Sequence, residues 1–74
     1  MSRDTRVTVL MKTAWPSQMI EATRVLNEVL GRAFFGAVGA LAAVRLGRLE
    51  CPEKLVALLC KRLRGLGVTV EVMR

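Results

Sequence analysis

Two short segments with alternating apolar side chains lie near opposite ends of the sequence and constrain the fold more than any other feature. Residues 7–11 place Val7, Val9 and Met11 on one side of an extended chain, and residues 68–72 repeat the alternation with three valines. Apolar, largely β-branched residues at a period of two predict strands with one buried face. Neither strand can bury that face alone, so we expect both to belong to one small sheet.

The chain between these strands carries the patterns of three helices. Apolar residues spaced three and four apart predict a first helix that begins at Ser17, whose side chain would cap it, and ends at Gly31 in a left-handed conformation. A second helix is expected over residues 34–44. A third is expected to begin with Pro52 at its first helical position, with leucines on its buried face and either Gly65 or Gly67 to end it.

These elements predict an α/β fold of the α+β sandwich type. We expect a small sheet of two to three strands, covered on one face by three helices, in the order β-α-α-(β)-α-β. The bracketed strand is residues 46–51, which are short enough to form either a loop or a brief edge strand. A chain of 74 residues can build one core, so we expect a single domain over residues 1–74.

The predicted second helix lies in an uncharged run of 12 residues, 33–44, which is flanked by arginines. This run falls short of the roughly 20 residues that span a bilayer, so no transmembrane segment is expected. Gly36, Gly39, Ala40 and Ala43 form a stripe of small residues within it. We expect this stripe to permit close packing inside the chain, or alternatively self-association.

Composition excludes most catalytic chemistry. The chain contains no His and no Tyr, which removes the commonest general base and the commonest zinc ligand. We therefore expect no enzyme activity, no catalytic residue, no metal, no cofactor and no small-molecule substrate. Cys51 and Cys60 are expected to be small buried hydrophobic residues. Residues 1–6 do not lead into the apolar segment of a signal peptide, so a cytoplasmic location is expected.

The Val29-Leu30-Gly31 turn between the first two helices, and the closing run of residues 63–72 with its Val70-Glu71-Val72 strand, resemble a known family. The family is the C-terminal domain of the bacterial ribosomal stalk protein, and the resemblance covers residues 7–72. Residues 8–31 are also similar to the protease adaptor ClpS, which shares that fold. The resemblance implies this fold and a general role in docking onto other proteins.

The stalk family binds its protein partners through the first two helices, which implies a docking face here. The implied partner-binding residues are Ile20, Arg24, Gly31, Phe34 and Phe35. Ile20 and Arg24 match an apolar and a basic contact, and Gly31 matches the turn glycine. Two adjacent phenylalanines cannot both easily enter a core this small, and Phe and Arg are favoured at interface centres. The alternative is that both rings belong to the core.

Asn27, Phe35 and Val38 stand where the stalk family usually has basic residues. The charge that attracts translation factors is therefore largely missing, and the resemblance does not identify the partner. Glu21 and Glu28 flank Arg24 at helical spacing, which predicts ion pairs along the helix surface.

Two functions follow from these patterns. The first is a non-catalytic protein-interaction module, an adaptor or accessory subunit in a larger assembly or a homo-oligomer. The alternative is a basic accessory protein that binds RNA or DNA, since twelve Lys and Arg against six Asp and Glu give a net charge of +6. Its expected basic patch comprises Arg45, Arg48, Lys61, Arg62 and Arg64. No aromatic residue is interleaved with these cations to stack on bases, which favours the first function.

Overall fold

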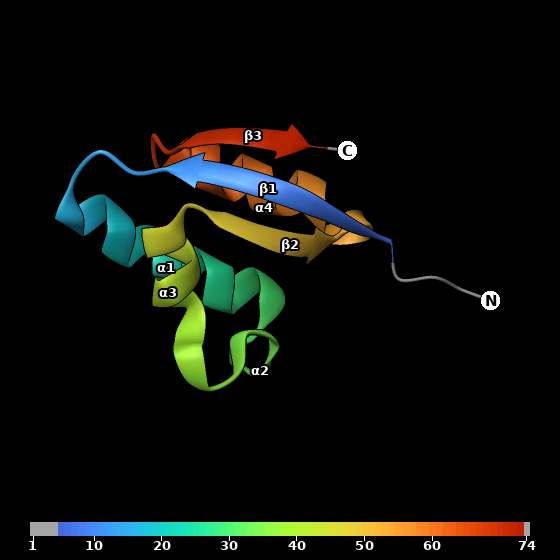
Figure 1. Cartoon of the computed structure of the whole chain (residues 1–74). Coiled ribbons are helices and arrows are strands. Elements are labelled where there is room, and N and C mark those ends of the chain that lie inside the picture. Colours follow the sequence, from blue (N-terminus) through green and yellow to red (C-terminus); the bar gives the residue numbers. More distant parts are fainter. Residues whose placement is uncertain (1–4, 74) are drawn as a thin grey trace.

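A three-stranded antiparallel sheet with helices on one face forms the framework of the computed structural model, which describes residues 5–73 (Figure 1). The elements follow in the order β1 (Arg6–Lys12), α1 (Pro16–Leu30), α2 (Arg32–Phe35), a 3-10 turn η1 (Gly36–Val38), α3 (Gly39–Leu46), β2 (Arg48–Pro52), α4 (Glu53–Gly65) and β3 (Thr69–Met73). This is the predicted small α+β fold in the predicted order. Two predictions, that no signal peptide is present and that the domain begins at residue 1, concern residues 1–4. Those residues lie outside the part of the chain that the structure describes.

The first strand occupies the centre of the sheet, in the order β2-β1-β3. Val9 lies opposite Leu49 of β2 and Val72 of β3, and both pairings are antiparallel. The two alternating segments at the ends of the chain are therefore neighbours, as predicted. The short segment left open between loop and strand is the edge strand β2.

One face of the sheet packs on the helices and the other faces outward. Val7, Val9 and Met11 point into the core, whereas the residues between them are only partly buried. Helix α4 contacts all three strands on this inner face and lies behind the sheet in Figure 1. Helices α1 and α3 lie below the sheet in the same view. The helical residues buried most completely in the core are Ala22, Leu26, Ala40, Leu59 and Leu63.

The start of α1 differs from the prediction. Trp15 is the cap residue and makes no side-chain cap hydrogen bond, and Pro16 occupies the first turn. The predicted cap at Ser17 is therefore wrong. Instead, the buried Gln18 side chain accepts a hydrogen bond from the Ala14 N–H at 2.6 Å.

The other end of the same amide reaches across the molecule. The Nε2 of Gln18 donates to the carbonyl oxygen of Leu66 at 3.0 Å. This side chain therefore ties the turn between β1 and α1 to the turn between α4 and β3, because it satisfies one backbone group in each.

The predicted second helix is broken into α2, η1 and α3. The break occurs at Gly36 and Gly39, whose φ angles of 63° and 77° are in a region that side chains disfavour. A Cβ atom at either position would have no neighbour within 4 Å. The expectation that these glycines permit close packing is therefore wrong, since they allow the chain to turn instead.

Cys51 and Cys60 are free and buried, on β2 and α4 respectively. Burial raises the pKa of the Cys51 thiol, the nearby Cys60 thiol raises it further, and Arg6 opposes the rise. The thiol form is therefore favoured inside the fold.

Among the described residues no single helix is long and apolar enough to cross a bilayer. A membrane-spanning length and hydropathy is reached only when two segments are taken together, Pro16–Leu30 and Arg32–Leu46. These segments are bent by 105° at the break between them. Much of their apolar surface, including Leu26 and Val44, lies in the core.

Candidate functional site

The outer surface of α1 carries a shallow hollow of about 460 Å³. Its lining residues are Ile20, Thr23, Arg24, Asn27, Glu28 and Arg32. The five α1 residues follow one another at alternating spacings of three and one, so they form one stripe on the solvent side of the helix. Arg32, at the start of α2, closes the C-terminal end. We call this set of six residues the α1 hollow.

Ile20 is the apolar feature of the α1 hollow. Its side chain is 61% exposed, whereas the buried face of α1 is made by residues such as Ala22 and Leu26. An exposed large aliphatic side chain is common when it stands alone, but here it lies in a concave site among polar neighbours. The Thr23 hydroxyl donates to the Met19 carbonyl oxygen at 2.8 Å, so its proton is already used within the helix.

The charge of the α1 hollow depends on a contact with another helix. Glu28 forms an ion pair with Arg62 of α4, with Oε1 and Nη2 2.5 Å apart. The sequence had predicted a pair between Glu28 and Arg24 along α1. Within residues 5–73, Arg24 and Arg32 have no ion pair, so the α1 hollow presents two free guanidinium groups in addition to Ile20.

The turn at Gly31 explains how Arg32 joins this site. Gly31 has φ 88° and ψ 148°, and its N–H donates to the Asn27 carbonyl oxygen at 2.9 Å. The φ angle is positive as predicted, but the ψ angle is extended and not left-handed helical. The chain therefore turns sharply into α2, and Arg32 lies against the end of α1.

Phe34 and Phe35 lie outside the α1 hollow. Their rings form an edge-to-face pair with centroids 5.0 Å apart, and both side chains are half-buried. Phe35 packs against the core, while the Arg6 guanidinium carbon lies 5.6 Å from the centre of the Phe34 ring. Of the residues predicted to bind a partner, the structure brings Ile20 and Arg24 together and places both rings elsewhere.

The residues of the predicted basic patch belong to three elements. Its members are Arg45 at the end of α3, Arg48 at the start of β2, and Lys61, Arg62 and Arg64 near the end of α4. Arg62 faces Glu28 of α1, and Arg64 donates to the Val70 carbonyl oxygen at 3.3 Å on the β3 side. Arg48 lies opposite Leu10 in the sheet, next to the buried Leu49. Arg62 therefore contacts α1, Arg64 contacts β3, and Arg48 lies on the edge strand β2.

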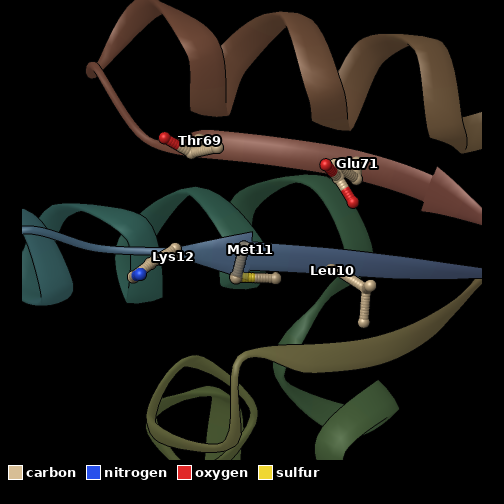
Figure 2. Close-up of a pocket in the computed structure, with 5 residues that line it drawn as sticks. All are labelled: Leu10, Met11, Lys12, Thr69 and Glu71. Atoms are coloured by element: carbon tan, nitrogen blue, oxygen red, sulfur yellow. The ribbon is translucent and has the colours of Figure 1, made fainter.

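A second hollow, of about 210 Å³, lies at the sheet and is lined by Leu10, Met11, Lys12, Thr69 and Glu71. Figure 2 shows these side chains spread along β1 and β3, with no common point of convergence. The site contains a single ammonium and a single carboxylate, and it holds no pairing of a nucleophile with a base. It therefore offers weaker grounds for a function than the α1 hollow.

Sequence reasoning missed Arg32 and the role of Glu28. Arg32 could have been found from its position directly after the turn glycine and eight residues after Arg24. The Glu28–Arg62 pair joins residues 34 positions apart and has no local signal. Across residues 5–73, no group of three or more Cys, Asp or Glu side chains is placed to hold a metal ion.

Comparison with known proteins adds no relative. No protein-family model matches the chain, no curated protein matches it, and no solved structure matches it. The function must therefore be argued from the geometry and charge of the chain itself.

Proposed function

We propose that this chain is a non-catalytic protein-interaction module, an adaptor or accessory subunit, that docks onto its partner through the α1 hollow. The observation that carries the proposal is the exposed Ile20 in one hollow with Arg24 and Arg32, which form no ion pair within residues 5–73. An apolar anchor surrounded by arginine is a typical composition for the centre of a protein interface. The resemblance to the stalk-protein C-terminal domain implies contacts at Ile20 and Arg24, which agrees with this choice.

The partner that suits this site is a segment with an apolar side chain beside acidic residues. The apolar group would cover Ile20, and carboxylates would meet the guanidinium groups, which can bind them in a bidentate manner. Glu28 does not oppose such a partner strongly, because Arg62 neutralises it. We place the module in the bacterial cytoplasm, within a larger assembly that supplies this segment.

Affinity capture from the native host tests the proposal when hollow variants are compared with a matched surface variant. Ile20→Ser and Arg24→Gln alter the α1 hollow, while Leu58→Ser alters an exposed leucine on α4. After nuclease treatment, we expect one set of proteins to be retained by the wild-type and Leu58→Ser chains. Loss of an interface anchor of this kind costs about 1.5–3 kcal/mol, so capture by Ile20→Ser should fall at least about tenfold.

The proposal is wrong if both hollow variants retain the same proteins as the wild-type chain, or if Leu58→Ser loses them equally. Circular dichroism must show that all variants are folded, since each change is on the surface.

Nucleic-acid binding remains the alternative because the net charge is +6. It is weakened because Arg62 and Arg64 already have acceptors within the protein and are less available to phosphates. Binding of single- and double-stranded oligonucleotides, measured across a salt series, distinguishes the two functions. A steep loss of affinity with salt that depends on Arg48 and Lys61 would favour the alternative, whereas absence of binding at low salt would exclude it.

A further inference from the structure

The exposed side of α3 is apolar apart from Arg45. Ala40 and Val44 are buried in the core. On the opposite side, Val38 and Leu46 are each 74% exposed, Leu41 is 43% exposed, and Ala42 is also exposed. We call Val38, Leu41, Ala42 and Leu46 the α3 face. Large apolar side chains that gather on one exposed surface often mark a contact site, and the α3 face has no covering within residues 5–73.

The chemistry around this face limits what can cover it. Residues 33–44 contain no side chain that forms hydrogen bonds, and residues 29–49 contain no carboxylate. Arginines flank the run, and Arg45 lies one helical turn from Leu41 on the exposed side of α3. The surface is therefore apolar apart from one cation, Arg45, which lies between Leu41 and Leu46 around the helix.

A second copy of the chain fits the α3 face poorly, because it would bring a second Arg45 close to the first. A protein partner usually supplies hydrogen bonds, about one per 100–200 Å² of interface, and the α3 face has no side chain to receive them. An anionic bilayer supplies what the face requires: acyl chains that need no hydrogen bonds, beside phosphates that attract Arg45.

We propose that the α3 face docks on the surface of an anionic phospholipid bilayer, with Val38, Leu41 and Leu46 entering the boundary between headgroups and acyl chains. The contact is interfacial and not spanning, because a helix of eight residues is only about 12 Å long. This surface is separate from the α1 hollow, so a membrane-bound chain would leave Ile20 free to receive its protein partner. The inference therefore goes beyond the proposed function and does not depend on it.

Flotation of the purified full chain with lipid vesicles tests the inference. We expect binding to vesicles of phosphatidylglycerol and phosphatidylcholine, weak binding to phosphatidylcholine alone, and a decrease as salt rises. The double variant Leu41→Gln/Leu46→Gln should bind at least about tenfold less, since each leucine loses its transfer into the apolar layer. Arg45→Gln should bind about fivefold less.

Leu58→Gln is the matched control, because Leu58 is 48% exposed, close to Leu41, but belongs to α4. It should bind vesicles like the wild-type chain, and so should Ile20→Ser, which separates this test from that of the proposed function. The inference is overturned if the wild-type chain does not float with anionic vesicles at low salt, or if the double variant floats equally well, which would indicate binding by charge alone.

Two further outcomes would assign the α3 face to another occupant. If sedimentation shows a dimer that the double variant converts to a monomer, a second copy covers the face. If the double variant loses a captured protein that the wild-type chain retains, a protein covers it. Either result would overturn the lipid proposal.

Discussion

Gln18 offers the most direct test of how the structure holds its two turns together. The variant Gln18→Met keeps the length of the side chain but removes both hydrogen bonds, those to the Ala14 N–H and to the Leu66 carbonyl oxygen. A buried backbone group left without a partner costs about 1–3 kcal/mol. Both turns are only partly buried, so water partly replaces each lost hydrogen bond and reduces this cost. We therefore expect the free energy of unfolding to fall by about 2–4 kcal/mol. For a domain of this size, that loss lowers the melting temperature by about 10–25 °C.

Thermal and urea unfolding followed by circular dichroism would measure this change, with Ser17→Ala as the control. The sequence pattern assigns Ser17 as the helix cap, and loss of a cap costs about 1 kcal/mol. The structure gives Ser17 no cap bond, so we expect Ser17→Ala to be within about 0.5 kcal/mol of the wild-type chain. The reasoning is refuted if Gln18→Met is as stable as the wild-type chain, or if Ser17→Ala is destabilised equally.

Further predictions concern the turn before β2, the core and the buried thiol. Gly47 has φ 80°, and a Cβ atom there would lie 2.9 Å from the Met11 carbonyl oxygen. Gly47→Ala should therefore lower the free energy of unfolding, measured in urea, by at least about 2 kcal/mol. A loss below about 0.5 kcal/mol would contradict the observed turn. Leu59→Ala removes a fully buried side chain and should cost about 2–5 kcal/mol, whereas Leu58→Ala should cost less than about 1 kcal/mol, and equal costs would disprove the packing of α4. Because burial raises the pKa of Cys51 above its ordinary 9.0, the thiol contributes fully to stability below pH 9.0, and this contribution falls as the pH rises further. Between pH 8 and pH 10, the urea midpoint of the wild-type chain should therefore fall more than that of Cys51→Ala. An equal fall in both proteins would show that groups other than Cys51 cause the loss of stability.

Alternation predicted the sheet well because it encodes the two faces of a strand directly. Val7, Val9 and Met11 needed only their spacing to be assigned to the core. The edge strand β2 was ambiguous because it is short and carries charges on its outer side.

The break between α2 and α3 was missed because Gly36 and Gly39 occur at a spacing that also suits one face of a helix. Spacing alone cannot distinguish a glycine that permits close packing from one that allows a positive φ angle. The structure distinguishes them, because no atom lies near either missing Cβ.

The α1 hollow was predictable in part. The family resemblance singled out Ile20 and Arg24. The charge balance was not predictable, because it depends on the position of Arg62, which reaches Glu28 only once α4 packs beside α1. A local pairing rule therefore selected the wrong partner for Glu28 and concealed the two free guanidinium groups.

Site-specific photo-crosslinking in the native host tests the docking proposal most directly. A photoreactive benzophenone side chain would replace Ile20 in one chain, Leu58 of α4 in a second and Glu50 of the outer sheet face in a third. All three positions are exposed, so they differ in surface and not in access. We predict a discrete protein adduct from the Ile20 position that Arg24→Gln weakens, with no such adduct from the other two. An adduct from the Leu58 or Glu50 position, with none from Ile20, would contradict docking through the α1 hollow.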